Sequence, residues 1–277
     1  MIEQFWLFHC GWFRAPRGAF EKGAGLIETV RLPFLAAVAY HPQFGPIVID
    51  APFGHEGPAN AGEVFGSFLR KAGQKFKPEW GIVPRIEQLG FRTSEVDHIL
   101  MTHLHWDHTG GMKELGHARF QIAELEWAHA MSLGAVEALR AGYAQSDFRA
   151  LASRVRRLNV EPSVDLSCGL DIFGDGSIEA VALPGHSPGH LGYRLRLTDG
   201  RSIFYLGDAV FSVAQVTDDV ELGIFPRIAA SSVPEAKLTL ARLRDWWRRS
   251  DRCEILICSH DTTWGARCMD GPHPVHQ

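Results

Sequence analysis

Cysteine is scarce in this sequence, and its five copies follow neither a metal-binding nor a disulfide pattern. They stand at positions 10, 168, 253, 258 and 268, an odd number without a C-x-x-C pair. This usage excludes a disulfide framework and a thiolate zinc site, and it is typical of a cytoplasmic protein. We expect all five to be inert buried thiols, because none has a sequence context that would stabilise a thiolate.

The chain also lacks long apolar runs and blocks of like charge. No uninterrupted apolar stretch approaches the roughly 18 residues of a membrane span, and acidic Glu3 stands where a signal peptide would carry Lys or Arg. The 28 Lys and Arg against 32 Asp and Glu give a net charge of −4. Without a basic track, neither nucleic acid nor a membrane is expected as partner, and a small molecule becomes the better candidate.

Short apolar runs alternate with helical stretches through all 277 residues, without an internal repeat or a low-complexity linker. This pattern predicts an α/β protein with a single domain over residues 1–277, large enough to fold without disulfides or a structural metal. Strands are expected at 5–9, 32–40, 46–50, 178–183, 191–197, 202–206 and 254–258. Helices are expected at 61–72, at 79–89, in an insert at 124–158, and from Ser232 onward, where Ser-Val-Pro-Glu fits a capping box.

Histidine, by contrast, is abundant, and the placement of its 14 copies is informative. An apolar stretch ending at Met101 runs directly into four candidate metal ligands, which are His103, His105, Asp107 and His108. Imidazole and carboxylate are the donors that suit zinc and similar ions in an open, water-binding site. In extended backbone the first two side chains point to one side, and the last two can turn toward a second position. The spacing therefore favours two metal ions over one.

Three further candidate ligands also follow predicted strands directly. His186 comes after a Pro-Gly turn, Asp208 comes after Gly207, and His260 comes after Ser259. Side chains at the carboxyl ends of several strands converge on one edge of a sheet, where α/β proteins build their sites. We therefore expect these three residues to join the four of the first motif.

In this order, the H-x-H-x-D-H motif at 103–108 followed by His186, Asp208 and His260 resembles the metallo-β-lactamase superfamily. The segment P-G-H-S-P-G-H at 184–190 is also similar to that family, and G-P-I-V-I-D at 45–50 resembles the strand before its first metal motif. The resemblance thus covers nearly the whole chain. It implies an αβ/βα four-layer sandwich of two mixed β-sheets flanked by helices, with the site at one sheet edge.

The resemblance also implies a role for each candidate ligand. It implies two metal sites bridged by Asp208, with His103, His105 and His186 at one and Asp107, His108 and His260 at the other. A hydroxide between the ions would be the nucleophile, because a divalent metal lowers the pKa of bound water from 15.7 to about 7. Asp107 and Asp208 are thus the expected catalytic residues, with Asp107 passing a proton to the leaving group. Two Zn²⁺ ions are expected, although Fe and Mn suit the same donors.

Within the superfamily, the sequence most resembles the N-acyl homoserine lactonase-like dinuclear zinc hydrolases. The H-L-H-W-D-H-T-G-G form of the motif, the insert at 124–158 and S-H-D at 259–261 carry this resemblance. It predicts hydrolysis of a small ester or lactone. Two positions depart from the lactonase pattern. Phe211 replaces the tyrosine that hydrogen-bonds the substrate carbonyl, and Ala51-Pro52 replaces the commoner Thr-Gly.

Two further groups of residues are predicted around the ligands. An apolar substrate pocket would be lined by Phe53, Trp106 and Phe211, although aromatic residues at these positions suit plain core packing equally well. Asp50 and Asp261 would orient ligand histidines through hydrogen bonds, although aspartate is also common at a strand end or in a turn. His190 would be a hydrogen-bonding partner near the site and not a ligand. The histidines outside these sets are expected on the surface or at helix caps.

Other functions use related motifs on the same scaffold. A mononuclear iron persulfide dioxygenase and a glyoxalase-type thioester hydrolase are the nearest alternatives. A non-catalytic binding protein would have lost metal ligands, whereas all seven positions are filled here. The resemblance also allows a homodimer, formed through an aromatic N-terminal segment with Phe5, Trp6, Trp12 and Phe13.

Overall fold

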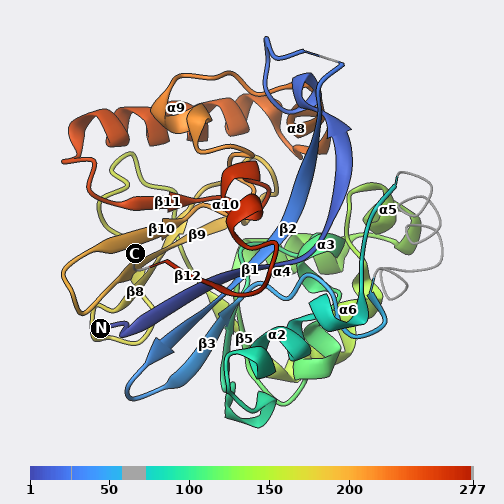
Figure 1. Cartoon of the computed structure of the whole chain (residues 1–277), viewed down its shortest axis with the longest axis vertical. Helices are drawn as coiled ribbons and strands as arrows, with labels where there is room; N and C mark the ends of the chain where they lie inside the picture. The colour runs from blue at the N-terminus through green and yellow to red at the C-terminus, as the bar shows by residue number, and fades with distance from the viewer. Residues whose placement is uncertain (26, 58–72, 276–277) are drawn as a thin grey trace.

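The computed structural model describes residues 1–25, 27–57 and 73–275, and it contains two mixed β-sheets (Figure 1). The seven-stranded sheet has the order β12 (His273–Pro274), β1 (Gln4–Pro16), β2 (Thr29–His41), β3 (Gly45–Ile49), β4 (His98–Leu100), β5 (Arg119–Ala123) and β6 (Val155–Leu158). The five-stranded sheet has the order β11 (Ile255–Ile257), β10 (Ser202–Tyr205), β9 (Leu191–Arg196), β8 (Ile178–Ala182) and β7 (Leu170–Asp171). The predicted helix at 61–72 lies outside the described residues.

Helices cover the outer face of each sheet (Figure 1). Those between β3 and β6 are α2 (Ile82–Gln88), α3 (Trp106–Thr109), α4 (Glu124–Ser132), α5 (Ala135–Arg140) and α6 (Gln145–Phe148). Those after β10 are α7 (Ala214–Thr217), α8 (Ile224–Ala229), α9 (Val233–Arg249) and α10 (Thr262–Arg267). Within the described part of the chain, no helix is long and apolar enough to cross a membrane.

Strand β2 explains why the fold has four layers, because it is buried on both faces. Its alternate residues Leu35, Ala37 and Ala39 join the core between the two sheets, whereas Phe34 and Val38 join the core beneath the helices of the first half. Successive side chains of a strand point to opposite faces, so a continuous apolar run serves two cores. A third core packs α9 against the outer face of the five-stranded sheet. The predicted sandwich is thereby confirmed.

Parallel pairing brings several strand ends to one edge of each sheet. Strands β3, β4, β5 and β6 are parallel neighbours, with Val48 level with Ile99 and Phe120 level with Val155. In the other sheet, β10 and β11 are also parallel. Every connection that leaves the carboxyl end of one of these strands starts from the same side. That side carries the predicted metal motif.

Most of the predicted elements are present, with three changes of extent. Strand β1 continues to Pro16, and the stretch predicted as one helix at 79–89 is a 3₁₀ turn, η3 (Pro78–Trp80), followed by α2. The insert at 124–158 is helical only through residue 154, because 155–158 pairs with β5 as strand β6. At the start of α9 the Ser232 hydroxyl accepts a hydrogen bond from the Glu235 backbone N–H, as the capping box predicts.

Two expectations about burial are wrong. His9 and His41, expected at the surface, are buried, because β1 and β2 run through the middle of the sandwich. Conversely, Cys168 and Cys253, expected to be buried, lie exposed in loops of the second half.

Candidate metal centre

All seven predicted ligands gather at one place between the two sheets. His103 and His105 lie in the connection that follows β4, and the ligands at 107 and 108 lie on α3. The other three lie directly after β8, β10 and β11. Their ligand atoms form two groups, and within each group these atoms lie within 4.8 Å of one another. We name them the three-histidine cluster, with His103, His105 and His186, and the Asp-His cluster, with Asp107, His108, Asp208 and His260.

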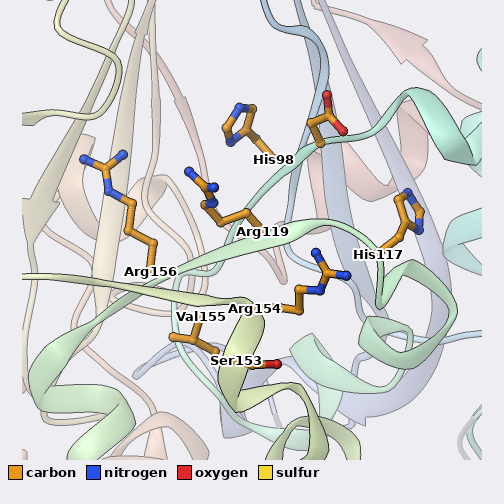
Figure 2. A pocket seen from close by; sticks show the side chains of 8 residues that line it. His98, His117, Arg119, Ser153, Arg154, Val155 and Arg156 are labelled. Carbon is orange, nitrogen blue, oxygen red and sulfur yellow. The ribbon is translucent and has the colours of Figure 1, made fainter.

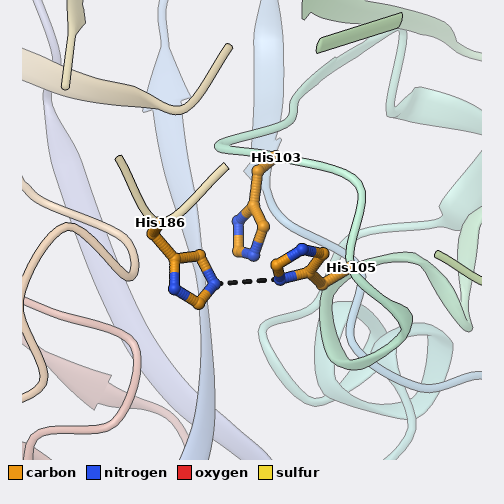
Figure 3. Close-up of side chains that lie close together, drawn as sticks. All are labelled: His103, His105 and His186. Carbon is orange, nitrogen blue, oxygen red and sulfur yellow. Dashed lines mark hydrogen bonds between the residues drawn. The ribbon is translucent and has the colours of Figure 1, made fainter. Parts of the chain in front are cut away.

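The three-histidine cluster consists of imidazoles that face one another (Figure 3). Nδ1 of His105 lies 2.9 Å from Nε2 of His186, and the ring of His103 is centred 4.5 Å from the ring of His105. Burial lowers the pKa of all three imidazoles, so they are neutral and present lone pairs. Nε2 of His103 is buried and makes no hydrogen bond within the described residues. Imidazole nitrogens that converge in this way and present lone pairs fit a divalent metal ion.

The Asp-His cluster pairs imidazoles with carboxylates. Nε2 of His260 lies 3.0 Å from Asp208 Oδ2 and 3.5 Å from Asp107 Oδ2, while Nε2 of His108 lies 3.3 Å from Asp208 Oδ1. Burial alone would lower the pKa of His260, but Asp208 and Asp107 raise it to about 10. Imidazole and carboxylate groups that bind a proton this tightly also bind divalent cations, because the cation competes with the proton for the same atoms. This cluster therefore also fits a metal ion.

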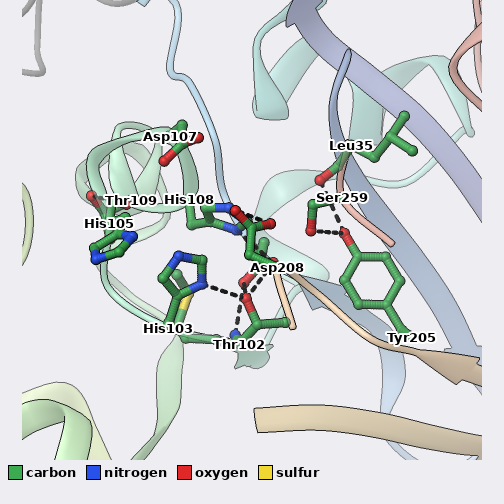
Figure 4. Close-up of polar contacts among 12 residues, drawn as sticks. Leu35, Thr102, His103, His105, Asp107, His108, Thr109, Tyr205, Asp208 and Ser259 are labelled. Carbon is green, nitrogen blue, oxygen red and sulfur yellow. Dashed lines mark hydrogen bonds and ion pairs between the residues drawn. The ribbon is translucent and has the colours of Figure 1, made fainter. Parts of the chain in front are cut away.

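Asp208 lies within reach of both clusters. Its Oδ2 atom is 3.5 Å from Nε2 of His186 in the three-histidine cluster, in addition to its contacts with His260 and His108. Burial opposes its charge, but His260 and His108 hold the pKa of its carboxyl well below the usual range. Figure 4 shows the carboxylate among the rings of the first motif. An ionised carboxylate in this position is suited to bridge two ions.

Asp50 supports the Asp-His cluster. Its carboxylate accepts hydrogen bonds from the Thr102 backbone N–H at 2.8 Å and from the Thr102 hydroxyl, and it lies 2.8 Å from Nδ1 of His108. It reaches these partners from a left-handed backbone conformation with φ 59°, which aspartate tolerates better than most residues. Likewise, Nδ1 of His260 contacts the Pro33 carbonyl at 2.7 Å. Fixing Nδ1 in this way leaves Nε2 of each imidazole for the site.

His190 and Asp261 lie beside the site, but neither contacts it as Asp50 does. Nε2 of His190 accepts a hydrogen bond from the backbone N–H of Asp208, and burial lowers the pKa of its ring to about 3, so it stays a neutral acceptor. Asp261 caps α10 by accepting from the Thr263 backbone N–H, and it also accepts from the Val213 N–H. It therefore fixes the loop next to Phe211 instead of orienting a ligand imidazole.

Sequence reasoning missed Glu126, which ties together the two loops of the three-histidine cluster. One of its oxygens accepts from the Leu104 backbone N–H at 3.0 Å, and the other accepts from the Ser187 hydroxyl at 2.7 Å and the Gly189 N–H at 3.0 Å. The side chain is fully buried in α4. The close approach also explains Gly189, where a Cβ atom would lie 2.2 Å from the Glu126 backbone nitrogen. Nothing in the local sequence distinguishes this glutamate from its exposed neighbour Glu124.

Of the three predicted pocket aromatics, Phe211 lies closest to the ligands. Its ring stacks on His260 with the centroids 5.0 Å apart, and it lies 5.8 Å from His186. Trp106 is half-buried and packs against Phe53. Phe53 is fully buried and supports Trp106 from behind. Its place in a substrate pocket stays a prediction.

Three buried tyrosines lie in the core near the site, and two of them have their hydroxyls bound to backbone carbonyls. Tyr193 and Tyr205 donate to the backbone carbonyls of Met101 and Leu35. Tyr143 packs its ring 5.0 Å from His105, and burial, with Glu126 nearby, raises the pKa of its hydroxyl. The site thus keeps the metal donors of the lactonase pattern without its tyrosine.

Comparison with known proteins assigns this chain to a superfamily of proteins. The model of the metallo-beta-lactamase superfamily matches residues 65–246, so the chain belongs to this superfamily. Its predicted class, a metal-dependent hydrolase with the fold of that superfamily, is thereby confirmed.

Two proteins of known sequence and one solved structure illustrate what this chain is similar to. N-acyl homoserine lactonase AttM of Agrobacterium fabrum is 26% identical over 261 residues, covering 91% of this chain and 90% of the relative. The probable metallo-hydrolase Rv2300c of Mycobacterium tuberculosis is 27% identical over 245 residues, covering 78% and 71%. A crystal structure of a B. thuringiensis AiiA variant with N-decanoyl-L-homoserine at its active site has a TM-score of 0.74 at 18% identity, covering 97% of each chain.

Proposed function

We propose that this protein is a dinuclear zinc hydrolase that opens small lactones or esters. The observation that carries the proposal is the pair of ligand clusters joined by Asp208. The similarity to lactonase AttM over 91% of the chain supports a lactone or a related ester as substrate. The second candidate, a thioester-hydrolysing or iron-dependent oxygenase site, uses the same donor types but gains no support from the matched relatives.

The two clusters would each hold one ion, and the seven residues named above would be the ligands. Bound divalent ions supply Lewis-acid activation of a water molecule and of the substrate carbonyl. Asp208 keeps its charge within the buried site, because His260 and His108 stabilise the carboxylate. Asp50, Pro33 and Glu126 hold the ligand side chains and their loops in place.

Asp107 is the residue best placed to move a proton to the leaving oxygen. Its side chain is 13% exposed, whereas that of Asp208 is 2% exposed, so Asp107 lies at the mouth of the site and Asp208 at its floor. Its carboxylate Oδ2 lies 3.5 Å from Nε2 of His260. A carboxylate in contact with both the site and the solvent can accept a proton and release it during one reaction cycle.

Phe211 and Trp106 would contact the substrate beside the ligands. Phe211 covers His260 with an apolar ring, which suits the hydrocarbon part of an acyl group and donates no hydrogen bond. Orientation of the substrate carbonyl would therefore fall mainly to ions held by the seven ligands. We infer that the enzyme separates lactones from open-chain esters less sharply than a relative that has tyrosine at this position.

A metal analysis combined with a substrate panel tests the proposal. We expect two divalent ions per chain and hydrolysis of acyl homoserine lactones or aryl esters, with Asp208→Ala lowering kcat/KM by about 1,000-fold or more. Asp245→Ala, an exposed residue of α9, is the matched control and should leave the rate unchanged. Unchanged hydrolysis in Asp208→Ala, or one iron per chain with oxygen uptake, would overturn the proposal.

A homodimer and a cytoplasmic location remain predictions from the sequence. Of the N-terminal aromatic residues, Phe5 is buried in the core between the sheets, so it cannot contribute to a subunit contact. Trp6, Trp12 and Phe13 are half-buried and keep part of their rings at the surface. Sedimentation of the metal-loaded protein, with Trp12→Ala as the test variant, would decide the oligomeric state.

A further inference from the structure

A cavity of about 480 Å³ lies at the other end of the parallel strands from the metal centre (Figure 2). The metal ligands follow the carboxyl end of β4, whereas the cavity is built where β4, β5 and β6 begin. Its polar lining comes mainly from Asp97, His98, His117, Arg119, Arg154 and Arg156. The two sites therefore share a sheet without sharing residues.

The cavity carries a surplus of positive charge. Three arginines line it against a single carboxylate, Asp97, in a chain whose net charge is −4. The side chains of Arg119 and Arg154 form no hydrogen bond or ion pair with any residue that the structure describes. Several exposed arginines elsewhere have carboxylate partners, as Arg92 has Glu95 at 3.2 Å and Arg248 has Asp219 at 2.6 Å. Two unpaired guanidinium groups beside one cavity present N–H donors in a planar fork. This geometry matches the oxygen atoms of phosphate and carboxylate groups.

One wall of the cavity is held in place from behind by Gln121, whose side chain is fully buried. Arg156 donates to the Gln121 carbonyl oxygen at 3.4 Å and to the Ile172 backbone carbonyl at 3.1 Å. The amide nitrogen of Gln121 lies 3.4 Å from Nδ1 of His98 and donates to it, which places the His98 proton on Nε2. The His98 ring is packed edge-on against Phe173. Arginine and histidine donors are thus pre-positioned, which reduces the entropy lost when a ligand binds.

We propose that this cavity binds a small polyanion, a ligand carrying two or more phosphate or carboxylate groups. Its volume lies within the range of about 300–1,000 Å³ of small-molecule pockets. Three arginines meet at one cavity in a chain whose net charge is −4, and this small charged area suits a compact anion better than a nucleic-acid strand. The ligand would occupy a site separate from the hydrolytic centre, so the proposal does not depend on the identity of the hydrolysed substrate.

Calorimetric titration of the metal-loaded protein at low ionic strength tests the proposal. The probes are fructose 1,6-bisphosphate for phosphate groups and tricarballylate for carboxylate groups. We expect one saturable site for at least one probe, and the stronger probe identifies the preferred group. The double variant Arg119→Ala/Arg154→Ala should weaken that binding by about tenfold or more, because it removes both unpaired guanidinium groups. Added NaCl should weaken it as well.

A charge-matched variant separates a built site from general attraction. Arg14→Ala/Arg140→Ala removes two exposed arginines from other surfaces and should change the affinity by less than about twofold. Arg119→Lys/Arg154→Lys keeps the charge without the planar fork, and it should fall between the wild type and the alanine pair. Absence of saturation by either probe below about 10 mM, or equal losses in the two alanine pairs, would overturn the proposal.

Discussion

The two ligand clusters lie side by side, yet they are held together in opposite ways. In the three-histidine cluster, three neutral imidazoles face one another, and the contact between them is the one of 2.9 Å between Nδ1 of His105 and Nε2 of His186, without an ion pair. In the Asp-His cluster, imidazoles and carboxylates compensate each other's charge. The first cluster therefore depends on its surroundings, above all on Glu126, to keep its shape before a metal binds. The second is shaped largely by its own ligands.

The largest difference should appear when one histidine of each cluster is removed from the metal-free protein. His260→Ala removes the imidazole closest to Asp208 and the one paired with Asp107, and we expect it to lower the free energy of unfolding by about 3 kcal/mol. His186→Ala removes a neutral ring whose Nε2 lies 2.9 Å from Nδ1 of His105, and the loss of this one contact between neutral groups is expected to cost about 1 kcal/mol. Urea unfolding at pH 7 with a chelator present measures both values. Equal losses would contradict the distinction between the clusters.

A second test removes the support of the three-histidine cluster without touching a ligand. Glu126→Gln replaces one acceptor oxygen by an NH₂ group, so either the Leu104 loop or the Ser187 loop loses its anchor. We expect the affinity for one of the two ions to fall by about 10- to 100-fold, while the other ion stays bound. Competition with a chromogenic chelator gives both constants.

Glu124→Gln is the control for this test, because Glu124 lies on the same helix but has a side chain that is 46% exposed and pairs with Arg157. It should leave both metal affinities unchanged. If Glu126→Gln lowered the affinity for both ions equally, the two clusters would depend on the same support, which would contradict the comparison.

The smallest effect is expected at Phe211, whose ring contacts one histidine of each cluster. Phe211→Tyr adds a hydroxyl beside the ligands, and one new hydrogen bond to a lactone carbonyl should raise the ratio of lactone to ester hydrolysis by about three- to tenfold. Steady-state kinetics on a matched lactone and ester measures this ratio. Phe225→Tyr, an exposed aromatic 6.4 Å from Phe211, should not change it.

The seven candidate ligands could be predicted from the sequence, because each motif follows an apolar strand and the strand order brings such strand ends together. Asp50 could be predicted for the same reason. Glu126 could not, because its role arises only where two loops meet it, one 22 and the other 61 residues away along the chain. The polyanion cavity was equally hidden, since its arginines come from strand starts, where charged residues are usually only solvated.

The order of the ligands along the chain has a consequence for how the protein acquires its metals. His186, which completes the three-histidine cluster, follows His103 by 83 positions, whereas His260, the last ligand of the Asp-His cluster, follows His103 by 157. At about 5–20 residues per second, a ribosome would need roughly 4–15 seconds for the 74 positions from His186 to His260. The nascent chain thus displays a complete three-histidine set well before its second site exists. Early loading at the three-histidine cluster would give the later half of the chain a metal centre to fold onto.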